Sequence, residues 1–114
     1  MGTDFDEKWL SQLRKGFLEL CVLTVLSQRE SSYGFELSQL FAAVEMGINE
    51  GTLYPLLNRM HRNGWLESEW ETPKEKGHPR RVYRLSRYGK EQLPGMLTAY
   101  NQHHDSLLKL RELS

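Results

Sequence analysis

Cysteine is almost absent from this chain, since Cys21 is the single one in 114 residues. One cysteine excludes an internal disulfide and a metal site built from several cysteines. Cys21 lies within an apolar helical run, and a thiol without a neighbouring base does not readily form the reactive thiolate. We therefore interpret Cys21 as a small core residue and not as a redox switch.

Long apolar segments are lacking too. No run is long enough to cross a bilayer, and the N-terminus does not have the pattern of a signal peptide. These absences predict a cytoplasmic protein. A length of 114 residues predicts one domain with a modest core, which dimerisation would enlarge.

The patterns of an enzyme are also missing: the sequence has no nucleophile–base pair, no set of metal ligands and no phosphate-binding loop. His103, His104 and Asp105 are adjacent, but neighbouring residues on a helix point about 100° apart and do not easily share one ion. We therefore expect no enzymatic activity, no cofactor and no bound metal.

An excess of one charge is absent from the totals, because 15 basic residues balance 15 acidic ones. The distribution is uneven, however. The first fifty residues contain eight acids and four bases, whereas the segment from Thr72 to Lys90 contains seven bases and one acid, Glu75. Because the local field decides phosphate binding, this basic segment can bind nucleic acid on a neutral protein.

Residues 49–62 are the most informative segment that is present. Four apolar residues repeat at the spacing of a buried helical stripe: Leu53, Leu56, Leu57 and Met60. Residues that can reach phosphates or base edges fall mainly on the other side: Thr52, Tyr54, Asn58, Arg59 and Arg62. The start of this helix is ambiguous. Asn49 is a good cap but leaves Pro55 in the second turn, whereas Thr52 as the cap would put Pro55 in the first turn.

Helical periodicity predicts two further helices before this segment. The first covers about residues 6–28, with a break at Gly16 and with Trp9 pointing outward toward a partner chain. The second covers about residues 33–44, with Ser31-Ser32 as its cap. A turn at Glu45-Met46-Gly47 follows, where Gly47 can adopt a positive φ. The buried stripe of the second helix comprises Tyr33, Leu37, Leu40, Phe41 and Val44.

After this segment the pattern changes to two strands. Residues 65–71 and 80–85 alternate and contain aromatic or branched side chains, and the loop between them contains two prolines and a glycine. Trp65 and Trp70 are expected to pack within the strands. Ser86 then caps a last helix over about residues 87–113. This order predicts an α+β winged helix-turn-helix domain over residues 1–86 and a dimerisation helix over residues 87–114.

The last helix has apolar residues at steps of three and four, which is typical of a helix that packs on another helix. Pro94-Gly95 should start or kink it. Because no helix of the same chain is left to receive so long a stripe, we expect a second subunit to cover it. A small effector could bind among the softer side chains Met96, Tyr100 and His103, or the seam could simply be imperfect. The predicted interface comprises Trp9, Leu93, Met96, Tyr100, His103, Leu107 and Leu110.

Three pieces in order closely resemble the PadR family of bacterial transcriptional regulators. They are the Tyr-Gly-Phe-Glu-Leu motif at residues 33–37, the Glu-Gly-Thr-Leu-Tyr-Pro-Leu-Leu motif at residues 50–57, and the Gly-His-Pro-Arg-Arg-Val-Tyr-Arg-Leu motif that begins at Gly77. The resemblance covers about residues 15–93 and matches the short form of the family. It implies a homodimeric repressor whose third helix enters the major groove, whose wings lie over the flanking backbone or minor groove, and whose terminal helices build the dimer.

The residues then divide into anchors and readers. We expect Gly51 to let the DNA backbone approach, and Thr52 and Tyr54 to anchor the helix on that backbone. Asn58 and Arg59 are expected to read base edges, and the basic wing is expected to add salt-dependent affinity. Tyr54 could instead be a structural aromatic and Arg59 a solvated charge, while Arg84 and Arg87 are better explained as ordinary surface charges. The candidate DNA contacts are Tyr33, Gly51, Thr52, Tyr54, Asn58, Arg59, Lys74, Lys76, His78, Arg80 and Arg81.

A second hypothesis remains open at this point. Winged helices also serve as protein-interaction modules, and here the basic wing would meet an acidic partner. The polar face of the 49–62 helix favours DNA, because an interaction module more often presents an apolar helix face.

Overall fold

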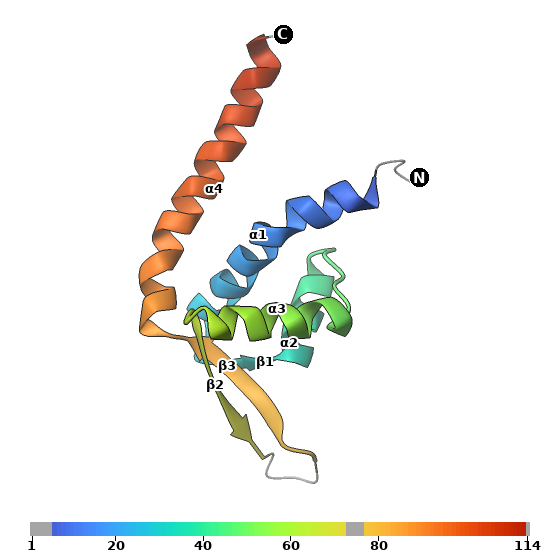
Figure 1. Cartoon of the computed structure of the whole chain (residues 1–114), viewed down its shortest axis with the longest axis vertical. Helices are drawn as coiled ribbons and strands as arrows, with labels where there is room; N and C mark the ends of the chain where they lie inside the picture. The colour runs from blue at the N-terminus through green and yellow to red at the C-terminus, as the bar shows by residue number, and fades with distance from the viewer. Residues whose placement is uncertain (1–5, 73–76, 114) are drawn as a thin grey trace.

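The computed structural model describes residues 6–72 and 77–113, which form four helices and three strands. In chain order they are α1 (Glu7–Ser27), β1 (Ser32–Tyr33), α2 (Gly34–Ala43), α3 (Glu50–Arg62), β2 (Leu66–Glu71), β3 (Arg80–Leu85) and α4 (Arg87–Leu113). Figure 1 shows the β2–β3 hairpin projecting from one end of the molecule and α4 extending from the other. The predicted α+β winged helix is confirmed.

The sheet contains a strand that the sequence did not predict. Its antiparallel order is β1-β3-β2, and β1 pairs Ser32 with Tyr83 and Tyr33 with Val82. A strand of two residues is too short to show an alternating pattern. The expected cap at Ser31-Ser32 was therefore wrong: Tyr33 occupies the cap position of α2, and the Glu36 carboxylate accepts hydrogen bonds from the Ser32 hydroxyl at 3.1 Å and the Tyr33 N–H at 3.2 Å.

Helix α1 runs without the break that was predicted at Gly16. Asp6 caps it, with its carboxylate accepting from the backbone N–H of Lys8 at 2.8 Å. A glycine inside a helix costs roughly 1 kcal/mol relative to alanine, which the packing of the second half outweighs. That half carries the buried residues, which are Leu18, Leu20, Val22, Leu23 and Leu26. Cys21 lies among them, half-buried, and burial raises the pKa of its thiol.

The turn between α2 and α3 places its positive φ on Glu45, at 62°, and not on Gly47 as predicted. The backbone explains the position. The N–H of Met46 bonds to the Phe41 carbonyl at 2.8 Å, and the N–H of Glu45 bonds to the Ala42 carbonyl at 3.0 Å. This is the hydrogen-bond pattern of a Schellman motif, in which the residue just after the helix adopts the left-handed conformation. Val44, predicted to be buried, is 65% exposed at this end.

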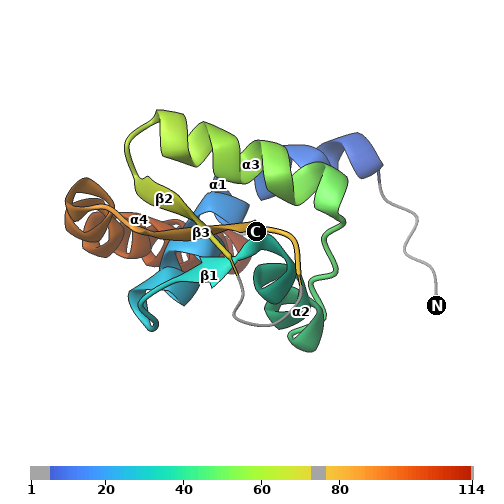
Figure 2. The same cartoon turned by 90° about the horizontal axis from the view of Figure 1, so that it is seen from below.

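The core lies where α1, α2 and α3 meet the sheet. The predicted apolar stripe of α3 is confirmed, because Leu53, Leu57 and Met60 are fully buried and Leu56 is 3% exposed. Val82, Tyr83 and Leu85 of β3 are buried as well. Helix α3 is thus held by one face and presents the other to solvent, and Figure 2 shows it running alongside the hairpin.

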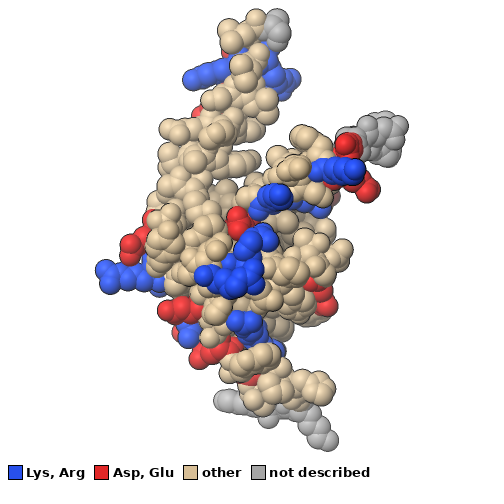
Figure 3. All heavy atoms as spheres, in the orientation of Figure 1, with Lys and Arg blue, Asp and Glu red and all other residues tan. Residues whose placement is uncertain are grey.

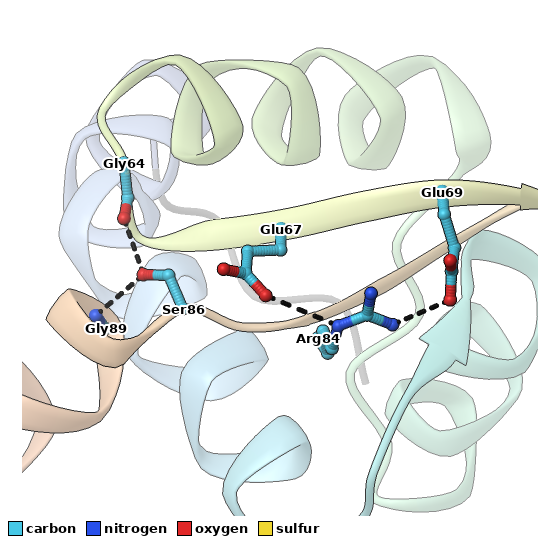
Figure 4. Close-up of polar contacts among 6 residues, drawn as sticks. All are labelled: Gly64, Glu67, Glu69, Arg84, Ser86 and Gly89. Atoms are coloured by element: carbon cyan, nitrogen blue, oxygen red, sulfur yellow. Dashed lines mark hydrogen bonds and ion pairs between the residues drawn. The ribbon is translucent and has the colours of Figure 1, made fainter.

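Helix α4 begins where Ser86 joins two parts of the chain. The Ser86 hydroxyl donates to the Gly64 carbonyl at 2.6 Å and accepts from the Gly89 N–H at 3.0 Å (Figure 4). The helix starts at Arg87 and continues through Pro94, so the expectation that Pro94-Gly95 might start it was wrong. Its first half packs against α1, and its second half extends into solvent (Figure 1). None of the described helices is long and apolar enough to cross a membrane.

Candidate nucleic-acid interface

The ambiguous start of α3 is resolved in favour of Asn49. Its side-chain oxygen accepts a hydrogen bond from the Thr52 N–H at 2.9 Å, and the helix begins at Glu50. Pro55 therefore lies in the second turn, and the Gly51 carbonyl loses the partner that a residue other than proline would supply. Gly51 and Thr52 are both exposed at this helix start, where water or another polar group can replace that partner.

Tyr54 is both exposed and structural. Its side chain is 42% exposed, yet its ring lies against Gly34 at the start of α2. A Cβ atom at Gly34 would come within 2.6 Å of Cε1 of Tyr54. Gly34 therefore leaves the space that the ring occupies, as the structural interpretation of Tyr54 requires, and the DNA contact stays a prediction. The Tyr-Gly pair in the 33–37 motif was the signal that could have pointed to this contact.

Asn58 of α3 is bonded to the hairpin. Its Oδ1 accepts from Nη1 of Arg81 at 3.1 Å, and Nε of Arg81 donates to the Ser68 hydroxyl at 3.0 Å. The Arg81 guanidinium also lies 5.2 Å from the centre of the Tyr83 ring. Burial raises the pKa of Tyr83, and Tyr54 adds to the shift, so the phenol stays neutral. These contacts connect α3 to both strands of the hairpin.

Arg59 lies on a different side of α3. Its Nε is 3.5 Å from Oε2 of Glu19 on α1, and the Glu19 side chain is only 15% exposed. The pair ties α3 to α1. In the structure Arg59 is therefore engaged within the chain, and a base contact would require it to leave or share Glu19.

Arg80 lies at the loop end of the hairpin, opposite Glu71, with its guanidinium over Tyr33. Its guanidinium carbon is 4.0 Å from the centre of the Tyr33 ring, and its Nη2 is 3.6 Å from a Glu71 carboxylate oxygen. The Nε of Arg80 is buried and has no hydrogen-bond partner. Stacking on an aromatic ring suits a guanidinium and fixes its plane.

A groove of about 450 Å³ lies between α3 and the hairpin, and Tyr54, Asn58, Arg80 and Arg81 all border it. Trp70 also borders it and is 71% exposed, so the prediction that Trp70 packs within the strands was wrong. Trp65, by contrast, lies just before β2 and is half-buried against the core. The lining residues are Tyr33, Gly34, Tyr54, Asn58, Trp70, Pro79, Arg80, Arg81 and Tyr83.

The other face of the hairpin is acidic. Arg84 pairs with Glu69 at 2.8 Å and with Glu67 at 3.4 Å (Figure 4), which lowers the pKa of Glu69 through the hydrogen bond and raises that of Arg84. The acids of β2 precede Thr72 in the sequence and pair with bases of β3 across the hairpin, so they offset part of the positive charge of the segment from Thr72 to Lys90. Arg87 pairs with Glu91 at 3.3 Å, so Arg84 and Arg87 are surface ion pairs, as the sequence suggested.

Three predicted contacts remain. His78 is exposed between Gly77 and Pro79, and Lys74 and Lys76 lie outside the described residues. On the face seen in Figure 3, basic side chains gather over α1 and α3, and acidic and basic side chains mix around the hairpin. Within residues 6–72 and 77–113, no group of three metal-ligating side chains comes together.

A helix with one buried and one polar face, presented beside an antiparallel hairpin, defines the class of winged helix-turn-helix proteins. A model of the PadR-like transcriptional regulator family matches residues 22–94. The chain belongs to this family, whose members are DNA-binding transcriptional regulators and not enzymes. No curated protein matches the chain.

Solved structures support the assignment. A PadR family transcriptional regulator from Eggerthella lenta is 33% identical, with 95% of this chain and 93% of that chain covered and a TM-score of 0.80. A PadR-like transcription factor from Bacteroides fragilis is 30% identical, with 90% and 98% covered and a TM-score of 0.77. A PadR-like regulator from Bacillus cereus is 33% identical, with 87% and 95% covered and a TM-score of 0.72.

Proposed function

We propose that this regulator is a homodimeric repressor in which α3 enters the major groove and the hairpin lies along the adjacent backbone. The observation that carries the proposal is the groove between α3 and the hairpin, where Tyr54, Asn58 and Arg81 face the same space. Repression is the direction that the family resemblance implies, and the cytoplasm is the compartment that the sequence predicts.

The two faces of the hairpin support one orientation on DNA. The face toward α3 carries Arg81 and exposed Trp70, whereas the other carries Glu67 and Glu69. Phosphates are repelled by the acidic face, so the wing should approach DNA through the side that borders α3. Exposed Thr52 and the N–H groups at the start of α3 would bind a phosphate, and Lys74, Lys76, His78 and Arg80 would add salt-dependent affinity.

The proposed dimer uses the outer part of α4. Leu93 is 7% exposed and Met96 is half-buried, so these two seam residues are used within their own chain, contrary to the idea that the whole stripe awaits a partner. Farther along, Leu107 is 57%, Leu110 is 61% and Leu113 is 82% exposed. Trp9 on α1 is also 56% exposed, and the proposal includes it in the interface. Two such surfaces would bury one another and set the spacing of the two α3 helices.

An effector site is proposed in the groove between α1 and α4, which measures about 540 Å³. Phe17 and Tyr100 meet there with ring centres 5.6 Å apart, and His103 and Leu107 lie farther along the same wall. An apolar, aromatic compound would suit this lining. Binding between the two helices would change their separation and hence the spacing of the reading helices.

The alternative of a protein-interaction module receives less support. The solvent face of α3 is polar, with Thr52, Asn58 and Arg59 exposed. An acidic partner would pair with the basic residues and contact the exposed rings of Tyr54 and Trp70, whereas exposed Thr52 and Asn58 offer hydrogen bonds that suit phosphates and base edges better.

A salt titration of binding to the promoter of the protein's own operon tests the function. We expect affinity to fall steeply with salt, and we expect Tyr54→Ala to weaken promoter binding more than binding to random DNA. Arg84→Ala is the matched control, because Arg84 lies on the acidic face. Equal binding of wild type and Tyr54→Ala to both DNAs would contradict sequence reading. A monomeric mass at micromolar concentration would contradict the dimer.

A further inference from the structure

The amide of Asn58 has a fixed orientation at the hairpin. Arginine carries donors only, so the atom of Asn58 that faces Nη1 of Arg81 at 3.1 Å must be the carbonyl oxygen. The NH₂ group of Asn58 is then left for another partner. We infer that Arg81 sets the hydrogen-bonding character of Asn58, so that the pair reads guanine and not adenine in the major groove. This inference rests on the DNA-binding function proposed above.

Arg81 is held well enough to act in this way. Its Nε donates to the Ser68 hydroxyl at 3.0 Å, and its guanidinium lies 5.2 Å from the centre of the Tyr83 ring. Ser68 and Tyr83 are themselves partners across β2 and β3. Contacts from both strands therefore place the guanidinium before DNA arrives, and little side-chain freedom is lost on binding. Arg81 is a positioning residue, and Asn58 is the residue that meets the base.

The chemistry of the base edges gives the preference. Asparagine reads adenine with both ends of its amide, donating to N7 and accepting from the N6 amino group. Here Oδ1 already accepts from Arg81, and an adenine amino group that approached it would meet the N–H groups of the guanidinium. Guanine presents two acceptors, N7 and O6, to the major groove. The NH₂ group of Asn58, which keeps two N–H donors while Oδ1 is occupied by Arg81, matches these two acceptors.

Arg84 shows the contrast within the same strand. It points to the acidic face, where its two hydrogen bonds go to Glu69 and Glu67 (Figure 4). It touches no residue of α3 among its hydrogen bonds and ion pairs in the described part of the chain. A substitution at Arg84 removes one positive charge from β3 without changing the amide of Asn58.

Selection from a randomised double-stranded DNA library by the full-length protein, followed by sequencing of the bound DNA, tests the inference. The wild type should enrich a motif with a guanine favoured over other bases by about tenfold or more at one position. Asn58→Ala should lose the preference at that position alone. Arg81→Ala frees Oδ1 and should shift the position toward adenine. Arg84→Ala should enrich the wild-type motif.

Asn58→Asp gives a second, independent readout, since the exposed side chain at this position leaves the fold unaffected. It keeps the pairing with Arg81 but presents acceptors, so the preference should move toward cytosine, whose N4 amino group donates. Two results would overturn the inference while leaving the DNA-binding function intact. One is an unchanged base preference in Arg81→Ala, and the other is a wild-type preference for adenine at the position that Asn58→Ala affects. Enrichment of no motif by the wild type would overturn the DNA-reading function and the inference together.

Discussion

Gly34→Ala should separate DNA binding from folding, because Gly34 makes room for a single side chain of the interface. A Cβ at this position would lie 2.6 Å from Cε1 and 3.0 Å from Cζ of Tyr54. Atoms cannot remain that close, so the Tyr54 ring must move. The ring is 42% exposed and can therefore swing toward solvent, which takes it out of the groove beside α3.

The magnitudes favour a folded protein with impaired binding. Overpacking costs about 1–3 kcal/mol, and alanine recovers up to about 1 kcal/mol of helix propensity. The free energy of unfolding should therefore fall by about 0–3 kcal/mol, which leaves a domain of ordinary stability folded. If the displaced tyrosine contributes about 1.4 kcal/mol or more to the binding free energy, its loss lowers the affinity for DNA at least about tenfold. Urea denaturation and fluorescence anisotropy with labelled promoter DNA measure the two effects.

Two control variants test whether the clash with the Tyr54 ring causes both effects. Gly16→Ala, on α1, meets no atom within 4 Å and should raise stability by up to about 1 kcal/mol without changing DNA affinity. In a Tyr54→Ala background the added methyl group meets no ring, so Gly34→Ala should then cost less than about 0.5 kcal/mol. Unchanged DNA affinity of Gly34→Ala, or a cost that persists without the ring, would refute the account of this contact.

Three further perturbations follow from the structure. A Cβ at Gly89 would overlap the carbonyl oxygen of Trp65, which is a backbone atom that cannot easily move. Gly89→Ala should therefore lower the free energy of unfolding, measured by urea denaturation, by about 2–4 kcal/mol. A loss smaller than that of Gly34→Ala would contradict this. Leu107→Glu places a charge on the exposed outer part of α4 and should lower the mass in solution from dimer to monomer without changing the thermal stability of the single chain; an unchanged dimer mass would exclude this surface. Burial raises the pKa of the Cys21 thiol, so alkylation near neutral pH should be slow in the native protein and fast in urea, whereas equal rates would show that Cys21 is accessible.

The periodicity of apolar residues predicted the helices and the hairpin, and α3 shows why this works. Leu53, Leu56, Leu57 and Met60 occupy the positions that a one-sided helix requires, and all four are buried. The cap at Ser86 was predictable too, since a hydroxyl at that place satisfies the N–H of Gly89.

Local sequence pattern failed to predict the features that depend on residues far away in the sequence or on backbone hydrogen bonds. The two residues of β1 form a strand only because Val82 and Tyr83 lie opposite them. The positive φ fell on Glu45 because helix-end hydrogen bonds, and not the presence of glycine nearby, fix that position. The basic character of the wing was overestimated because the acids of β2 face the bases of β3 across the sheet.

In the candidate interface, too, residue types could be predicted from the sequence, whereas contacts between distant residues could not. The sequence pointed to Tyr54, Asn58 and the wing bases from their chemistry. It gave no sign that Asn58 is bonded to Arg81 or that Arg59 pairs with Glu19, because 23 residues separate the first pair and the second joins two helices. Trp70 was missed as a groove residue, since an aromatic in a strand more often packs inward.

Mapping amide chemical shifts while promoter DNA is added tests the central claim most directly. Large changes should fall on α3 from Glu50 to Arg62, on Trp70 and Arg81, which line the groove, and on Ser68, which accepts a hydrogen bond from Arg81. Glu67, Glu69 and the outer part of α4 should change little. Large changes confined to α4 or to the acidic face of the hairpin, with α3 unchanged, would contradict it.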